Sequence, residues 1–259
     1  MEARTPWQIQ KAAVQALYLR EMKTRFGSQK WGYFWAVIEP AAFVAIFWVM
    51  FGFHLRKSMP GVDYPMFLLT GMVPGFLFSE IVNRLMNAFE ANRALFNYRQ
   101  VKPIDSFIAR VLVECLVYFA VFVAFVGAGN LLGFQTAVAD IFSLCLIIAV
   151  LILFSFGLGL LFAVVGSFSE NFKKVVGLIM RPLFFTSGIF FTISVVPEKF
   201  RGILLVNPLL HFLELIRAYY FETLRSPYAD LGYVLCWTIS VLFLSLWLYE
   251  KLQKKIIAS

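Results

Sequence analysis

Long apolar runs without charged residues are the feature that most limits how this chain folds. Residues 115–139, 141–169 and 231–249 contain no Asp, Glu, Lys or Arg. About 20 such residues are enough for a helix to cross the ~30 Å hydrocarbon core of a membrane. Charged residues make up only 15% of the 259 residues, whereas about a quarter is usual in a soluble domain. The sequence therefore predicts an integral membrane protein.

Three further segments have the length of a membrane span but are interrupted. They are 33–53 with Glu39, 64–86 with Pro74, Glu80 and Arg84, and 175–193 with Arg181 and Pro182. Glu80 and Arg84 stand four residues apart, so they can neutralise each other on one helix face. The runs are continuous and lack the ten-residue alternation typical of a β-barrel. We predict an all-α integral membrane fold, one domain over 1–259, with six transmembrane helices at 33–53, 64–86, 108–133, 141–168, 175–193 and 231–249.

The positive charges indicate how this bundle is oriented. With the N-terminus inside, 16 of the 23 Lys and Arg residues fall on the cytoplasmic side and six on the outer side. Short loops rich in Lys and Arg stay cytoplasmic, so both termini are expected in the cytoplasm. The first 30 residues have no apolar stretch typical of a cleavable signal peptide. We expect the first transmembrane helix to target the chain.

Two segments are expected to lie on the cytoplasmic side. Thr5 to Gln8 resembles a capping box with Pro6 at the first helical position, which predicts an N-terminal helix over 5–30. The polar segment 89–105 contains Phe96 and Tyr98, which we expect to be exposed beside Arg and Lys. Exposed aromatics of this kind form either a docking surface or an ordinary aromatic belt at the membrane interface. Asp105 is expected to cap the third transmembrane helix.

The segment between the fifth and sixth predicted transmembrane helices is too interrupted to cross the membrane. Pro197, Pro208 and Pro227 break it, and its apolar pieces are shorter than a span. We expect short re-entrant or interfacial helices over 195–228, forming a lid at the outer surface.

The motifs of common active sites are missing. The sequence has no P-loop, no H-E-x-x-H and no G-x-S-x-G. Its three cysteines all fall in predicted spans, which favours packing over a disulfide or metal site. We therefore expect no catalytic residue, no metal and no cofactor in this chain, and nucleotide hydrolysis in another chain if nucleotide drives it.

Charged residues inside predicted spans are the candidates for a gate. Glu39, Glu114 and Arg181 lie at depths where an unpaired charge costs about 2 to 3 kcal/mol or more. Such residues face the bundle interior and pair with one another. A role at a cytoplasmic gate, and pairing with Arg110, Arg181 or backbone groups purely for packing, are both open at this point.

Aromatic residues reach 18% of the chain, including 30 Phe. Most are explained by lipid-facing bulk and interface belts. A minority is a candidate lining for a conduit, because aromatic faces stack on the apolar faces of sugar rings. The candidates are Phe43, Phe47 and Phe51 in the first predicted span and Phe184, Phe185, Phe190 and Phe191 in the fifth.

Short motifs give the chain a family resemblance. In order they are Leu19-Arg20-Glu21, Thr24-Arg25-Phe26-Gly27, Gly32-Tyr33, Glu39-Pro40, Glu90-Ala91-Asn92, Leu95-Phe96-Asn97-Tyr98-Arg99, Val101-Lys102-Pro103-Ile104-Asp105 and Asn207-Pro208-Leu209. With this order and spacing the chain resembles the permease subunit of an ABC-2 type exporter, most closely the KpsM-like permeases that export capsular polysaccharide in Gram-negative bacteria.

The resemblance implies partners and a cargo. It implies an inner-membrane homodimer resting on two ATPase subunits, which bind ATP and Mg²⁺, with periplasmic adaptor or co-polymerase and outer-membrane export proteins, and no nucleic acid. It implies that the N-terminal helix is an interface helix and that the coupling residues are Phe96, Asn97, Tyr98, Arg99, Lys102 and Asp105. The expected cargo is a lipid-linked acidic polysaccharide. A net charge of +8 suits such a cargo, although topology alone explains it.

Two other functions are compatible with the residues. One is a membrane-embedded enzyme acting on lipid-linked sugars, and the other is a passive channel. Export of a different polysaccharide, such as O-antigen or teichoic acid, is a variant of the first hypothesis.

Overall fold

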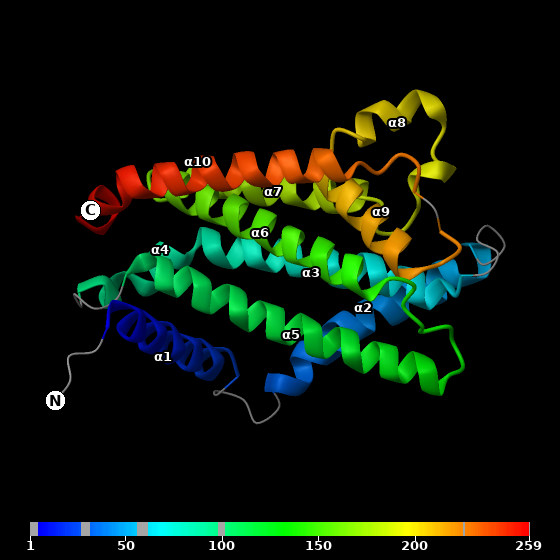
Figure 1. The fold of residues 1–259 in the computed structure, drawn as a ribbon, viewed down its shortest axis with the longest axis horizontal. Coiled ribbons are helices and arrows are strands. Elements are labelled where there is room, and N and C mark those ends of the chain that lie inside the picture. Colours follow the sequence, from blue (N-terminus) through cyan, green and yellow to red (C-terminus); the bar gives the residue numbers. More distant parts are fainter. Residues whose placement is uncertain (1–4, 27–31, 56–61, 98–101, 225, 259) are drawn as a thin grey trace.

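The computed structural model describes residues 5–26, 32–55, 62–97, 102–224 and 226–258. Within these residues the regular structure is entirely helical, which confirms the all-α prediction. Most of the long helices run side by side along the long axis of the molecule (Figure 1). The packing around one central helix explains how the others are placed.

The central helix is α3 (Tyr64–Met86). It packs against α2, α5, α6, α7 and α9, and most of its side chains are buried. Glycine allows the close approach of α6, since a Cβ added at Gly159 would lie 2.8 Å from the Cβ of Leu85. Small residues at such contacts are typical of helices packed in a membrane. The bounds of α3 are those predicted for the second span.

Four described helices are long and apolar enough to cross a membrane. They are α3, α5 (Pro103–Leu131), α6 (Ile141–Gly166) and α10 (Leu231–Ala258). The last three correspond to the predicted spans 108–133, 141–168 and 231–249. α5 begins at Pro103, earlier than predicted. α10 continues past the predicted span into the charged C-terminal residues.

The first and fifth predicted spans are also helices. α2 (Gly32–Leu55) agrees with the predicted 33–53. α7 (Glu170–Thr186) is shifted from the predicted 175–193. It begins early because the Ser169 side chain accepts a hydrogen bond from the backbone N–H of Phe172. It ends early because Gly188 adopts a φ of 73°, a left-handed conformation that turns the chain. Seventeen residues give α7 a length of about 26 Å.

Short helices fill the end of the molecule that lies far from the chain termini (Figure 1). They are the 3₁₀-helix η2 (Ile193–Val195), α8 (Glu198–Leu204) and α9 (Pro208–Tyr220). α8 and α9 meet at 105°. Short helices were predicted over 195–228. The prediction that they form a lid at the surface is wrong for α9, which is buried. Ten of its 13 residues are buried, and it packs against α3, α6 and α10.

The opposite end holds the start of α1 (Pro6–Phe26), α4 (Ala88–Asn92) and the end of α10 (Figure 1). The predicted capping box is present, because the Thr5 N–H donates to Gln8 Oε1 (3.0 Å) and the Gln8 N–H donates to Thr5 Oγ1 (3.4 Å). α1 packs mainly against α5, and it agrees with the predicted helix up to Phe26; the remaining predicted residues, 27–30, lie outside the described part of the chain. α4 is followed by the 3₁₀-helix η1 (Arg93–Asn97).

Candidate functional site

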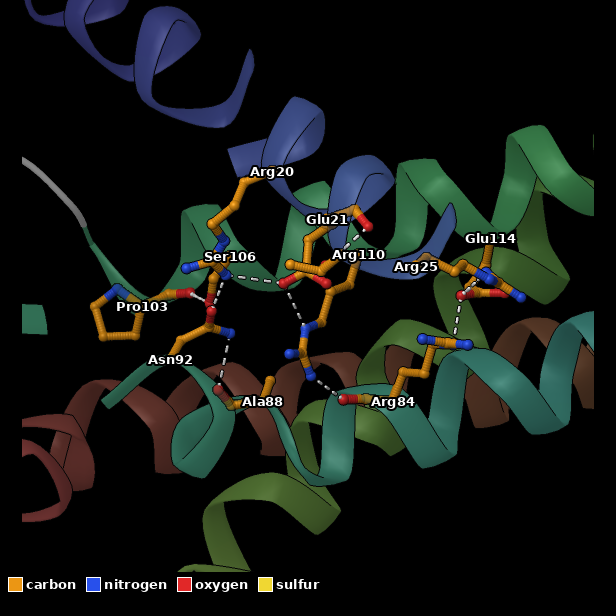
Figure 2. A network of polar contacts seen from close by, with 11 residues as sticks. Arg20, Glu21, Arg25, Arg84, Ala88, Asn92, Pro103, Ser106, Arg110 and Glu114 are labelled. Carbon is orange, nitrogen blue, oxygen red and sulfur yellow. Dashed lines mark hydrogen bonds and ion pairs between the residues drawn. The ribbon is translucent and has the colours of Figure 1, made fainter. Parts of the chain in front are cut away.

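A cluster of charged side chains joins α1, α3 and α5 near the termini end of the bundle (Figure 2). We call it the ion cluster; its members are Arg20, Glu21, Arg25, Glu80, Arg84, Arg110 and Glu114. It therefore contains four arginines and three glutamates. Each of the three helices supplies at least one arginine and one glutamate, and most of the ion pairs join two different helices.

Glu114 is the most deeply buried member, with a side-chain exposure of 1%. Its carboxylate accepts from Arg25 of α1 and from Arg84 Nε of α3, the latter at 2.6 Å. A buried carboxylate is tolerated only when partners replace its lost hydration. The prediction of pairing is confirmed, but the expected partners Arg110 and Arg181 are wrong. α5 begins at Pro103, which places Glu114 three turns along it and opposite the end of α1.

Arg110 makes a second link between the same three helices. Its Nε donates to Glu21 Oε1 of α1 (3.2 Å) and its Nη1 donates to the backbone carbonyl of Arg84 (2.7 Å). That carbonyl belongs to the last turn of α3, where carbonyls lack a partner within the helix and a cation is favourable. Arg84 also pairs with Glu80 at 3.3 Å, as the sequence predicted. The ion cluster thus ties the end of α3 to α1 and α5.

The segment that follows α3 is contacted from three other helices. The backbone N–H of Ile104 donates to the Tyr249 hydroxyl of α10 (3.2 Å). From α1, Arg20 donates to Asn92 Oδ1 and Gln10 Nε2 donates to Asp105 Oδ1, the latter at 3.2 Å. From α7, Lys173 pairs with Glu90. A displacement of the segment from Glu90 to Asp105 would therefore act on α1, α7 and α10 as well as on its flanking helices α3 and α5.

The predicted coupling residues lie in or next to this segment. Lys102 is exposed, and its backbone N–H donates to Asp105 Oδ2 (3.1 Å). Asp105 is buried and caps the start of α5, as expected. The expected exposure of Phe96 is wrong, because its ring is half-buried and packs edge-on against Phe89 (6.3 Å). Tyr98, Arg99 and the side chain of Asn97 lie outside the described residues.

The candidate conduit residues form one aromatic row between α2, α3 and α7. Ring centroids are 4.4 Å apart for Phe47 and Phe190, 5.9 Å for Phe190 and Phe185, and 6.0 Å for Phe185 and Phe184. Phe76 of α3, which the sequence analysis missed, completes the row. Its ring lies 5.2 Å from Phe184 and 5.8 Å from Phe43.

The two remaining conduit candidates are not placed in this row. The backbone carbonyl of Phe191 accepts from Arg217 Nη1 (3.2 Å), and the side chain of Phe51 lies outside the described residues. Among the gate candidates, Arg181 is exposed on α7 and has no ion pair among the described residues. The side chain of Glu39 also lies outside the described part.

A second buried polar group was missed by the sequence analysis; it lies at the end of the bundle far from the chain termini, which we call the outer end because of the predicted topology. Arg217 of α9 is 1% exposed and lies over the Phe67 ring, 3.7 Å from its centroid. Its guanidinium donates to three backbone carbonyls, those of Gly188 and Phe191 and that of Ile189 at 2.6 Å. The carbonyls belong to the turn after α7. Gly71 leaves room for the guanidinium, since a Cβ there would lie 2.3 Å from Arg217 Nη2.

Glu214 and His211 extend this group along α9. Glu214 accepts from the backbone N–H of Ile193 (3.0 Å) and from the Ser226 hydroxyl. His211 Nδ1 accepts from the backbone N–H of Asp230 (3.1 Å), and its Nε2 lies 2.8 Å from the Leu205 carbonyl. In the sequence, this group could have been found from its ionisable residues, which stand three positions apart within an apolar segment. We call His211, Glu214 and Arg217 the outer clamp.

Neither cluster is arranged for acid, base or metal chemistry. The carboxylates of Glu114 and Glu214 are engaged by arginines or by backbone and hydroxyl donors, and the two clusters lie on different ends of the bundle. In the described residues, no three His, Cys, Asp or Glu side chains converge as metal ligands. The side chains of the ion cluster join helices to one another, and those of the outer clamp hold backbone turns in place.

Apolar helices of membrane-spanning length, with polar clusters that tie them together at both ends, are typical of the domain of an integral membrane protein. The chain belongs to the ABC-2 type transporter family, whose sequence profile matches residues 12–221. It is 40% identical over 257 residues to the polysialic acid transport protein KpsM of Escherichia coli, covering 99% of this chain and 100% of that protein.

Two further relatives carry similar names. The capsule polysaccharide export inner-membrane protein CtrC of Neisseria meningitidis is 29% identical over 249 residues, covering 95% of this chain and 93% of the relative. The corresponding protein BexB of Haemophilus influenzae is 26% identical over 246 residues, with the same coverage. The family resemblance drawn from the short motifs is therefore confirmed, and the chain is a transporter subunit.

Proposed function

We propose that this chain is the permease subunit of an ATP-driven exporter that moves a capsular polysaccharide across the bacterial inner membrane. Three relatives are named for the transport or export of such polymers, and the first is similar over the whole of its length. In this proposal α2 and α7 complete a set of six transmembrane helices, and both termini face the cytoplasm. Two copies form the conduit, and separate ATPase subunits bind ATP and Mg²⁺.

The observation that carries the proposal is the contact pattern of the segment from Glu90 to Asp105. This segment bonds to α1, α7 and α10 and connects α3 to α5. An ATPase that pushes on it would move most of the bundle at once. The ion cluster lies next to this segment and transmits the motion between α1, α3 and α5.

The cargo path in this proposal follows the aromatic row of α2, α3 and α7. Phe43 and Phe185 of the row remain 44% and 57% exposed, so their rings can meet a passing sugar chain. An acidic, lipid-linked polymer fits a conduit that excludes hydrocarbon, because a charged chain cannot cross lipid unaided. Exposed Phe200 and Ile203 on α8 offer periplasmic export proteins a surface at the opposite end.

Charge reversal at the coupling segment tests the proposal. Arg99→Glu combined with Lys102→Glu is expected to reduce both co-purification of the ATPase and polysaccharide export by about tenfold or more, because the docking surface changes sign. Lys199→Glu on the outer helix α8 is the control, since it reverses one lysine charge at an exposed site far from the segment. Unchanged complex formation and export in the double variant would contradict the coupling assignment.

A further inference from the structure

A long groove runs along α5 on the side that faces α6. α5 and α6 both pack on α3 and touch each other little, so they leave a cavity of ≈ 1100 Å³. This volume is slightly above the range of about 300 to 1,000 Å³ usual for ligand sites. Lining residues on α5 extend from Ile108 to Phe122, a length of about 21 Å. The groove is distinct from the aromatic row of α2, α3 and α7.

The groove is apolar along most of its length. Its inner part is closed by Phe122, Leu144, Ile148 and Ile216. The hydroxyl groups present there are already used, since Thr70 Oγ1 donates within α3 and Tyr220 OH donates to the Thr136 carbonyl (3.2 Å). A ligand in this part would gain from burial of hydrocarbon and would find few polar partners.

The other end of the groove is polar and cationic. Trp7, Gln10, Lys11 and Gln15 of α1 line it beside the start of α5. Lys11 and Gln15 are exposed and make no hydrogen bond or ion pair with other residues in the described part of the chain. Trp7 is 73% exposed, and tryptophan is enriched where a membrane meets water. A free ammonium group therefore stands at the mouth of a hydrocarbon-lined slot.

We propose that this groove holds one anionic phospholipid of the surrounding membrane. Its phosphate lies at Lys11 and Gln15, and one acyl chain lies along α5 toward Ile216. The half-thickness of the hydrocarbon core is about 15 Å, so a groove of about 21 Å takes a full acyl chain together with its glycerol end. The proposal needs only that the bundle sits in a membrane, as in its family, and it does not depend on the exported polymer.

Lipid retention by the purified full-length chain tests the proposal. The chain is exchanged into detergent with equal amounts of phosphatidylglycerol and phosphatidylethanolamine of identical acyl chains and is then examined by native mass spectrometry. We expect one bound phosphatidylglycerol per chain. Ile148→Trp fills the groove and is expected to reduce bound lipid at least fivefold. Leu146→Trp, on the exposed face of the same helix, is the control and is expected to retain it.

The charge at the mouth is tested by a variant that leaves the apolar core untouched. Lys11→Gln is expected to lower the preference for phosphatidylglycerol about fivefold, since one lysine near an anionic surface is worth about 1 kcal/mol. Lys23→Gln, in the last turn of the same helix, is expected to change nothing. Absence of bound lipid in the wild type, equal losses in both tryptophan variants, equal effects of the two lysine variants, or a second copy of the chain in place of lipid would overturn the proposal.

Discussion

The two ends of the bundle solve the same problem, the burial of charge, in different ways. In the ion cluster, arginines from one helix pair with glutamates from another, as Arg25 and Arg84 do with Glu114. In the outer clamp, Arg217 and Glu214 bond mainly to backbone groups of nearby turns. Ion pairs between side chains can exchange partners when helices shift. Bonds to a fixed backbone turn cannot be exchanged without refolding the turn.

The difference agrees with what each end has to do in the proposed exporter. The termini end receives the motion of the ATPase, and several of its charges already have two partners, as Arg84 has in Glu80 and Glu114. The outer end holds α9 and the turn after α7 in one arrangement. We therefore expect the termini end to tolerate rearranged charges and the outer end to tolerate none.

Arg217 is where loss of one side chain should have the largest effect. Arg217→Ala leaves the carbonyls of Gly188, Ile189 and Phe191 without this donor and removes the group stacked on Phe67. We expect a loss of about 5 kcal/mol in the free energy of unfolding, measured by thermal unfolding in detergent. Arg217→Lys is expected to recover little, because an ammonium lacks the planar fork of donors. Full stability of Arg217→Lys would show that charge alone holds this end.

Glu114 is expected to give the largest effect within the ion cluster. Glu114→Gln removes the buried negative charge that Arg25 and Arg84 share, at a cost of about 3 kcal/mol. The combined variant with Arg84→Gln should cost less than the sum of the two single variants, since it also removes one unpaired cation. A double-mutant cycle of unfolding free energies measures this. Additive effects would mean that the two residues do not interact.

A charge exchange between Glu21 and Arg110 tests the tolerance of the ion cluster directly. Either single reversal puts like charges together and should cost about 1 kcal/mol, because the pair is only partly buried. Glu21→Arg with Arg110→Glu should regain the part of the stability and of the export activity that depends on the ion pair, but not the part that depends on the bond from Arg110 to the Arg84 carbonyl. The same exchange between Glu214 and Arg217 is the matched comparison and should not regain either, since their partners are backbone groups. Equal rescue at both ends would remove the distinction.

Much of the fold could be predicted because apolar length is a local property of the sequence. The starts of α3 and α6 directly follow Asp63 and Asp140, the acidic residues that precede their apolar runs. The end of α7 could not be predicted, since residues up to 193 are apolar and only the left-handed turn at Gly188 ends the helix. The partners of Glu114 could not be predicted either. Arg25 is 89 residues away, and only the packing of α1 on α5 brings it near.

Replacement of Asp140, at the outer end, is expected to have the smallest effect on stability. It tests whether the stability of that end depends on charge at all. Hydrogen bonds from Ser143 hold the pKa of the exposed Asp140 carboxyl below its usual value. The carboxylate also caps α6 by accepting from the Ser143 N–H (3.1 Å). Because the folded pKa is lowered, this stabilisation is present above the unfolded pKa of about 3.9 and is lost as the pH falls through the lower, folded value.

Asp140→Asn separates the cap from the charge. Asparagine is as good an N-cap as aspartate, so the variant should match the wild type in unfolding temperature above about pH 4 and become the more stable of the two on acidification. The wild type alone should lose the contribution of this cap as the pH falls below the unfolded pKa of about 3.9. An unchanged pH dependence in Asp140→Asn would assign the acid sensitivity to other carboxylates.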